Sequence, residues 1–249
     1  MNNHSDTSLS LINPFKVTSA DTDTFSRIRL GALVNLLIQS AINSADQLGF
    51  GFGGIKQQHL FWVLSRLHID IERPLLWYES VSVETWPKNV EKILYLRDFI
   101  VRDKDQQVVA RATSGWLAID FESKRPKIIE GLDAELFSWL KNKHAINKLP
   151  EKIFPVKEGE AFNFKATYFD IDLNKHVTSS RYVDWMMDTF PLDFHQKHYP
   201  KKLLINYNKE TLPGEQVNLI RHENESGSFK FEGVNRQSNS NAYRGQLIF

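Results

Sequence analysis

The stretch that decides the fold reads Phe169-Asp170-Ile171-Asp172-Leu173-Asn174-Lys175-His176, and a weaker copy of it stands earlier in the chain. The earlier copy reads Ala20-Asp21-Thr22-Asp23-Thr24-Phe25-Ser26-Arg27, so Asp172 follows Asp23 at an offset of 149 residues. Each copy leads into a segment whose apolar residues fall at helical spacing: Leu33, Leu36, Leu37 and Ala41 in the first, and Tyr182, Trp185, Met186 and Phe190 in the second. The repeat predicts two copies of one structural unit.

A second match lies downstream at a smaller offset. Residues 69–81 align with residues 205–217 at an offset of 136, so the first copy carries 13 extra residues (149 less 136). We expect these in the glycine-rich stretch Gly49–Gly54, because glycine clusters are typical of loops.

Strand-like runs follow each predicted helix. They cover residues 63–71, 79–86, 92–102 and 108–121 in the first half, and 202–208, 215–222, 228–235 and 242–249 in the second. A helix lying across a strongly curved antiparallel sheet is the hot-dog arrangement. The sequence therefore predicts an α+β fold, a tandem double hot-dog in which a curved antiparallel β-sheet wraps a central helix in each half.

The domain boundaries follow from this repeat. We expect an N-terminal hot-dog over residues 1–130, a helical linker over 131–158 and a C-terminal hot-dog over 159–249. An amphipathic helix is predicted inside the linker, carried by Leu132, Leu136, Phe137 and Leu140.

Composition excludes several classes of protein. The 249 residues include no cysteine, which rules out disulfides, cysteine metal ligands and a thiol nucleophile and fits a reducing compartment. A net charge of +1 argues against nucleic acid as the main partner. The polar segment Met1–Ser10 lacks the apolar core of a secretory signal, and no apolar run is long enough to span a membrane. We expect a cytoplasmic protein.

The two copies differ in their polar residues. The second carries Asp172, Asn174 and His176, whereas the first keeps Asp23 but has Phe25 and Arg27 at the other two positions. Further on, Glu210 stands where the first copy has Pro74. A duplicated domain that keeps one active site and gives the other half to binding is expected to show this asymmetry.

Asp172, Asn174 and His176 alternate along the chain, so in an extended segment their side chains share one face. They precede a predicted helix N-terminus, where free N–H groups favour developing negative charge. Asn174 can donate to an oxyanion, His176 or Glu210 can take a proton from water, and Asp172 can orient a neighbour or act as the base. The competing interpretation is structural, because Asp and Asn also cap helices and fill turns. No cluster with metal-ligand spacing is visible, and no cofactor is expected.

Several motifs together resemble the plant and bacterial acyl-acyl carrier protein (acyl-ACP) thioesterases. In the first half they are Trp62–Ile69, Glu84-Thr85-Trp86, Arg97-Asp98-Phe99 and Ala110-Arg111-Ala112-Thr113-Ser114-Gly115-Trp116. In the second half they are Asp172–Val177 followed by Arg181, Tyr182 and Trp185, and then Tyr207-Asn208-Lys209-Glu210. The resemblance covers nearly the whole chain from about Phe15.

The resemblance implies hydrolysis of fatty acyl-ACP thioesters, which releases free fatty acid and ends fatty acid synthesis. It implies that Asp172, Asn174, His176 and Glu210 are catalytic and that the first half shapes an acyl pocket around Leu33, Leu36 and Leu37. Thr211 stands where plant members often have Cys, and Thr178-Ser179 replaces a common Asn-Asn pair. A bacterial cytoplasmic enzyme is the simpler interpretation, because plant members carry a targeting extension.

Acylated ACP is the expected partner, and the sequence leaves homodimer formation open. Cations for an acidic carrier could come from three groups: Lys201 and Lys202, Arg97 and Arg102, or Lys124, Arg125 and Lys127. Two alternatives stay open: an acyl-CoA thioesterase and a non-catalytic acyl-chain or carrier-binding module.

Overall fold

The computed structural model describes residues 9–129, 140, 142–225 and 227–249. The first half contains β1 (Leu11–Lys16), η2 (Ser19–Asp21), α1 (Leu30–Gln47), α2 (Phe52–Lys56), β2 (Leu60–Ile71), β3 (Ser80–Glu91), β4 (Leu94–Asp103), β5 (Val108–Asp120) and β6 (Pro126–Lys127). The second half contains β7 (Glu160–Lys165), η3 (Tyr168–Asp170), α4 (Ser179–Met187), α5 (Leu192–Lys197), β8 (Lys202–Tyr207), β9 (Gln216–Glu225), β10 (Ser228–Asn235) and β11 (Ser240–Ile248).

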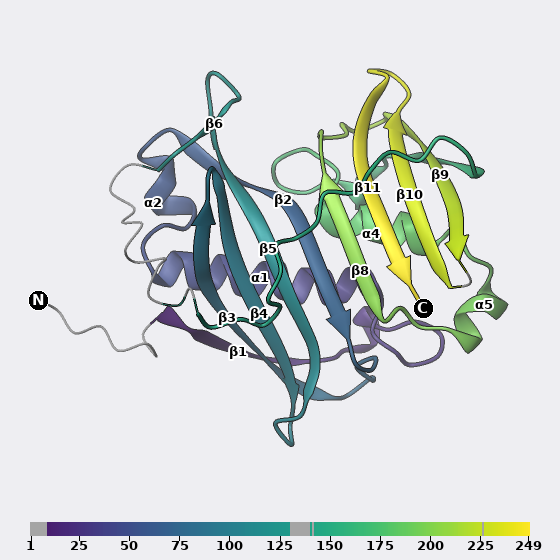
Figure 1. Ribbon diagram of the computed structural model, residues 1–249, viewed down its shortest axis with the longest axis horizontal. Helices are drawn as coiled ribbons and strands as arrows, with labels where there is room; N and C mark the ends of the chain where they lie inside the picture. The colour runs from purple at the N-terminus through teal and green to yellow at the C-terminus, as the bar shows by residue number, and fades with distance from the viewer. Residues whose placement is uncertain (1–8, 130–139, 141, 226) are drawn as a thin grey trace, which may run out of the picture.

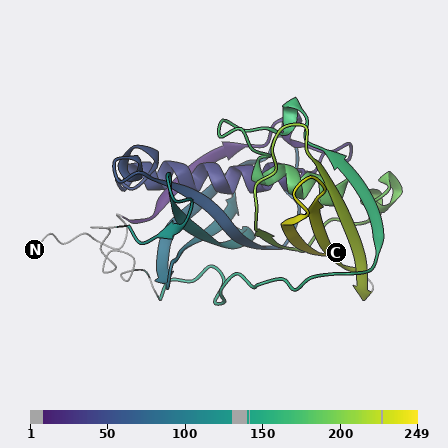
Figure 2. The ribbon, with the colours of Figure 1, turned by 90° about the horizontal axis from the view of Figure 1, so that it is seen from above.

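One antiparallel sheet runs through both halves. Its strand order is β1-β3-β4-β5-β2-β8-β11-β10-β9-β7, with β6 beside β5. The halves join where β2 pairs with β8, with Leu67 opposite Ile205 and Ile69 opposite Leu203. Helices α1 and α4 lie on one face of this curved sheet (Figures 1 and 2). The predicted α+β tandem hot-dog is confirmed.

Backbone hydrogen bonds repeat between the halves at the two offsets seen in the sequence. Val17 N donates to Glu79 O in the first half, and Ala166 N donates to Glu215 O in the second, both at 2.9 Å. Likewise β1 pairs with β3 from Leu11, and β7 pairs with β9 from Glu160. The alignment inferred from residue types therefore describes the same local structure twice.

The helices differ in length, which corrects one expectation. Helix α1 has 18 residues and α4 has nine, although both start at equivalent positions, Leu30 and Ser179. Helix length therefore accounts for most of the 13 extra residues that we expected in the stretch Gly49–Gly54. Two polar residues of α1, Ser40 and Ser44, are buried, and Ser40 Oγ donates to Leu36 O at 2.8 Å.

One hydrophobic core spans the two halves. It contains Leu33, Val34 and Leu37 from α1, Val183 and Met186 from α4, and inward residues of the strands such as Ile69, Leu203 and Phe231. Full burial of each large apolar side chain stabilises the fold by about 1.5–3 kcal/mol. The two halves are therefore expected to unfold together.

Between the halves, the described residues 142–159 cross the face of the sheet opposite the helices (Figure 2). Backbone carbonyls of this segment accept hydrogen bonds from side chains of three strands: Trp86 Nε1 to Lys143 O at 3.1 Å, Arg66 Nη1 to Pro150 O at 3.3 Å and Asn206 Nδ2 to Glu151 O at 2.9 Å. Its described residues 142–159 contain turns and extended chain. The predicted linker helix lies outside the described residues, except for Leu140, which is buried.

Helices α1 and α4 approach closely at Gly31. A Cβ added there would overlap the carboxylate of Asp184 and lie 3.0 Å from Ser180 O. Asp184 could move only by disturbing its 2.7 Å ion pair with Arg181. Gly31→Ala is therefore expected to lower the free energy of unfolding by about 1–3 kcal/mol, measured by urea denaturation.

The control for this prediction is Gly53→Ala in α2, where an added Cβ would meet nothing within 4 Å. We expect its stability to be unchanged or slightly increased, because alanine favours helix over glycine. Equal stability of the two variants would contradict the close helix contact.

Candidate active site

The segment before α4 is a rigid turn held by Asp170. Asp170 Oδ2 accepts from both the amide and the hydroxyl of Thr167 at 2.7 Å, forming a capping box around η3. Asp170 Oδ1 accepts from Arg181 Nε at 2.8 Å. Burial raises the pKa of Asp170, but the bonds from Thr167 and Arg181 outweigh it and hold this pKa below its usual value. The turn is thus tied to the first helical turn of α4.

Asp172 shapes the next turn with its carboxylate. Its Oδ1 accepts from the amide of Asn174 at 2.8 Å and of His176 at 3.4 Å. Its own amide donates to His176 O at 2.9 Å, and Lys175 takes a left-handed conformation with φ of 65°. We infer that Asp172 positions the two residues that the sequence analysis grouped with it.

Glu210 reaches this turn from the end of β8. The amide of Val177 donates to Thr211 O at 2.9 Å, which holds the Glu210 segment against the His176 segment. Tyr207 Oη donates to Ser179 O at 3.0 Å, and Lys209 N donates to Ala242 O at 3.1 Å. The structure therefore brings together two segments that are 34 residues apart in the chain (176 to 210).

Among the described residues, no hydrogen bond joins the side chain of one predicted catalytic residue to the side chain of another, and the Asp172 carboxylate contacts only the backbone amides of Asn174 and His176. Asp172 and His176 are half-buried, whereas Asn174 and Glu210 are exposed. Catalytic hydrogen bonds are often long or unformed before substrate binds. The arrangement thus presents a donor amide, an imidazole and a carboxylate toward solvent from two adjoining segments.

The structure narrows the choice of backbone donors. The amide of Val177 already donates to Thr211 O, and the amide of Thr178 donates to Asp170 O, both at 2.9 Å. Of the three amides at 177–179 only that of Ser179, the first residue of α4, makes no hydrogen bond to a described residue. Of these three amides, that of Ser179 is therefore the one left free to donate to a bound group.

Three tyrosines pack together beside this corner, of which Tyr182 and Tyr243 are buried and Tyr207 is half-buried. The ring of Tyr182 lies 4.6 Å from that of Tyr243 and 6.0 Å from that of Tyr207, centroid to centroid. Burial raises the pKa of Tyr182 to about 12, so its phenol stays neutral near pH 7 and cannot serve as a base. Tyr182 is therefore not a candidate base at this corner.

The first-half copy of the turn is closed by an ion pair. Asp23 Oδ1 accepts from the amides of Phe25 and Arg27 at 2.8 and 2.9 Å, as Asp172 does in the second half. The Arg27 side chain then binds Asp23 Oδ2 at 2.9 Å and donates to His195 O at 2.6 Å. The two turns share a backbone, but the first is bonded to α5 and carries no free imidazole or carboxylate.

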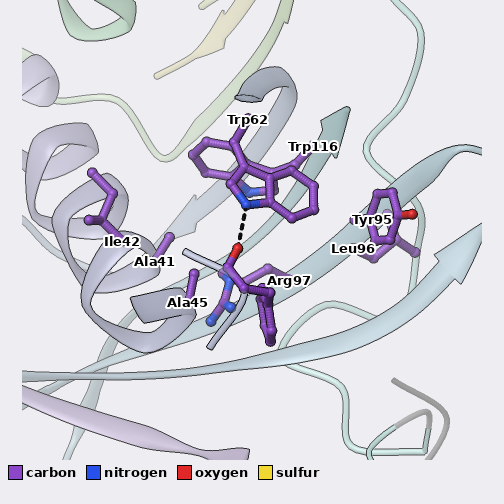
Figure 3. Close-up of a pocket in the computed structure, with 9 residues that line it drawn as sticks. Ala41, Ile42, Ala45, Trp62, Tyr95, Leu96, Arg97 and Trp116 are labelled. Atoms are coloured by element: carbon purple, nitrogen blue, oxygen red, sulfur yellow. Dashed lines mark hydrogen bonds between the residues drawn. The ribbon is translucent and has the colours of Figure 1, made fainter. Parts of the chain in front are cut away.

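A small apolar cavity of about 60 Å³ lies in the first half, between α1 and the sheet (Figure 3). It is lined by Ala41, Ile42, Ala45, Phe50, Trp62, Tyr95, Leu96, Arg97 and Trp116. Trp62 Nε1 donates to Phe50 O at 2.8 Å, which fixes one indole of the wall. The small side chains of Ala41 and Ala45, one helical turn apart, leave the space that the two tryptophans border.

The predicted acyl contacts lie elsewhere on the same helix. Leu33 and Leu37 are fully buried in the core, Leu36 is half-buried, and the cavity begins at Ala41. Their contact with an acyl chain stays a prediction. At 1.5 Å per residue, Ala41 lies roughly 15 Å along α1 from Gly31, where α1 contacts the start of α4. The cavity is thus displaced along α1 from the candidate catalytic corner.

Arg97 was expected to be a surface cation, and this expectation is wrong. Its guanidinium is buried and donates to Ser44 Oγ at 2.8 Å and Thr85 Oγ1 at 3.3 Å. Burial lowers its pKa to about 9. A side chain enclosed in this way cannot bind a partner protein.

The described residues were also compared with the requirements of a metal site and of a membrane-spanning helix. Within the described ranges, no three His, Asp or Glu side chains are placed to hold a metal ion. Of the helices that the structure describes, none has the length and apolar character of a membrane span.

Comparison with protein families gives two matches that together cover most of the chain. Residues 10–133 match the acyl-ACP thioesterase N-terminal domain, and residues 154–247 match the acyl-ACP thioesterase C-terminal domain. A curated relative, oleoyl-acyl carrier protein thioesterase 1 of Arabidopsis thaliana (chloroplastic), is 25% identical over 230 residues. The match covers 85% of this chain and 63% of the plant protein, so this chain spans less than two thirds of that relative.

Solved structures agree. An acyl-ACP thioesterase from Bacteroides thetaiotaomicron is similar with a TM-score of 0.90 and 27% identity, covering 98% of this chain and 99% of that one. A 12:0-ACP thioesterase from Umbellularia californica has a TM-score of 0.83 and 21% identity over 100% of this chain and 98% of its own, which supports the fold alone.

Asp170→Asn tests the rigidity of the turn through pH. Because the folded state holds the pKa of Asp170 below its unfolded value of about 4, the stability it contributes is fully present above that value and is lost as pH falls through the lower folded pKa. We expect the variant to lose about 1 kcal/mol near pH 7, and the difference from wild type to shrink below about pH 4. Thermal unfolding across pH measures this.

The matched control is Asp21→Asn, which alters the same capping box in the first half without an arginine partner. We expect a smaller loss of stability. A loss at Asp170 that stays constant down to the lowest pH would contradict the proposed ion pair.

Proposed function

Because this chain belongs to the acyl-ACP thioesterase family, we propose that it hydrolyses fatty acyl-ACP. Water adds to the thioester carbonyl carbon, the C–S bond breaks, and the carrier thiol leaves with a proton. Free fatty acid is released, which ends elongation of that chain. The observation that carries this proposal is the pair of equivalent turns, of which only the second presents an imidazole, an amide and a carboxylate.

Glu210 is proposed as the base that takes a proton from the attacking water. His176 is proposed to give a proton to the thiolate that leaves when the C–S bond breaks, and to be reprotonated from Glu210. Asn174 and the Ser179 amide would bind the developing oxyanion. Asp172 would act through the turn, since its carboxylate already accepts from the amides of Asn174 and His176. These roles are supported by the juxtaposition of the 172–178 and 208–211 segments.

Removing either proton-transfer group tests the mechanism. We expect Glu210→Ala and His176→Ala each to lower kcat at least about 100-fold with a palmitoyl-ACP substrate, because positioned acid–base groups contribute that much or more. The measurement is the release of free carrier thiol over time.

Glu122→Ala and His144→Ala are matched controls, because both residues are exposed and lie outside this corner. They should keep the wild-type rate. Near-normal turnover by the Glu210 and His176 variants would refute the assignment.

We place the far end of the acyl chain in the apolar cavity beside α1. Ala45→Leu would shorten this cavity, so the ratio of kcat/KM for a long acyl chain to that for a short one should fall about tenfold. Gln47→Leu, on the exposed side of the same helix, should leave the ratio unchanged. Hydrolysis of acyl-ACP substrates of graded length measures both. An unchanged ratio in Ala45→Leu would remove the cavity from the proposal.

We propose the bacterial cytoplasm as the place of action, in line with the similarity to the Bacteroides enzyme. The curated relative of Arabidopsis thaliana is chloroplastic. Assays with acyl-CoA, run in parallel with acyl-ACP, distinguish an acyl-ACP thioesterase from an acyl-CoA thioesterase. Equal or faster turnover of acyl-CoA would favour the second.

A further inference from the structure

An exposed apolar cluster borders the catalytic turn. Tyr168, Phe169 and Leu173 are 87%, 86% and 87% exposed, which are among the highest values for large apolar residues in the described chain. They interleave with the proposed site residues, since Leu173 stands between Asp172 and Asn174. Exposed apolar groups gathered on one surface commonly mark interaction sites. We call these three residues the rim cluster.

The rim cluster is held rigidly. Tyr168 and Phe169 belong to η3, which the Asp170–Thr167 capping box closes. Their rings meet edge to face, with centroids 5.4 Å apart and planes at 83°. Aromatic groups presented on a fixed backbone lose little conformational entropy on binding. The local geometry therefore suits recognition better than a mobile segment would.

The first half provides an internal comparison. At the equivalent positions of its turn stand Ser19, Ala20 and Thr24. The backbone is the same, with a capping box formed by Thr18 and Asp21, so the turn does not require large apolar residues. The rim cluster thus occurs on the turn with the catalytic groups and not on the turn without them.

Three lysines lie close to the rim cluster in the chain or in the adjoining Glu210 segment. Lys165 ends β7, Lys175 lies in the Asp172 turn, and Lys209 precedes Glu210. All three are exposed and make no ion pair with a described residue. An apolar centre with a basic margin is complementary to an acidic protein surface that carries its own apolar side chains.

We propose that the rim cluster and its three lysines are the docking surface for the acidic carrier protein that delivers the acyl thioester. This rests on the proposed function. Whatever covers Tyr168, Phe169 and Leu173 lies directly over the turn of Asp172 and Asn174. A carrier seated there delivers its thioester to these groups, whereas a membrane or a second copy of this chain would close them off from a protein-bound substrate.

The test transplants the first-half residues into the second half. The triple variant Tyr168→Ser, Phe169→Ala, Leu173→Thr should raise KM for acyl-ACP at least tenfold. It should change kcat/KM less than twofold for the N-acetylcysteamine thioester of the same acyl group, which lacks the protein. The control Trp77→Ser, Tyr78→Ser removes exposed aromatics beside the first-half turn and should change neither value. An unchanged KM for acyl-ACP, or an equal loss with both substrates, would overturn the proposal.

A direct measurement of acyl-ACP binding tests the docking surface independently of the proposed hydrolysis. In a Glu210→Ala background, which prevents turnover, acyl-ACP should bind at least tenfold more weakly to the triple variant than to the protein with an intact rim cluster. Charge reversal of Lys165, Lys175 and Lys209 should also weaken the binding of acyl-ACP, and the loss of affinity should be larger at low salt than at high salt. If the wild-type chain hydrolyses no thioester but this difference is found, the proposed function fails and the docking surface stands.

Two other results would reassign the surface. Binding to phosphatidylglycerol vesicles that the triple variant loses, with unchanged affinity for acyl-ACP, would make the rim cluster a membrane contact. A dimer that the triple variant converts to a monomer, with the same unchanged affinity, would make it a subunit interface. Either result overturns carrier docking.

Discussion

The hydrogen bond from Val177 N to Thr211 O, 2.9 Å long, is the constraint on which the candidate site depends. It joins the residue after His176 to the residue after Glu210, and so it brings an imidazole and a carboxylate from distant parts of the chain to one corner. The first half forms the equivalent bond from Ile28 N to Leu75 O at 2.8 Å. There the neighbouring residues are Arg27 and Pro74, and the same backbone supports no proton transfer.

This contrast explains how one duplicated plan serves two purposes. The second half kept a short helix, an exposed donor amide and two segments open to solvent. The first half has a longer helix, α1, whose added turns carry Ala41 and Ala45 to the wall of an apolar cavity. Its own turn is locked by Asp23 and Arg27 and bonded to α5. We propose that chemistry and chain binding belong to different halves of one sheet, and these halves are joined where β2 pairs with β8.

Much of the fold could be predicted because each copy of the repeated turn is a short, continuous segment of sequence. Asp23 and Asp172 accept hydrogen bonds from backbone amides in equivalent turns, so their offset in the sequence identifies equivalent backbone. The cavity could not be predicted, because Ala45, Trp62 and Trp116 meet only through strand pairing and helix packing. The burial of Arg97 was missed for the same reason, since its partners Ser44 and Thr85 come from α1 and β3. For the four site residues, the sequence indicated which side chains to compare, and the structure added the backbone bonds that bring them together.

We propose that water, activated at the Glu210 corner, attacks the thioester directly. A single turnover of acyl-ACP in ¹⁸O-labelled water tests this most directly, with mass analysis of both the fatty acid and the protein. We predict that every released fatty acid carries one ¹⁸O and that the peptide containing Glu210 carries none. Unlabelled fatty acid together with a labelled Glu210 peptide would show attack by the carboxylate itself and contradict the account.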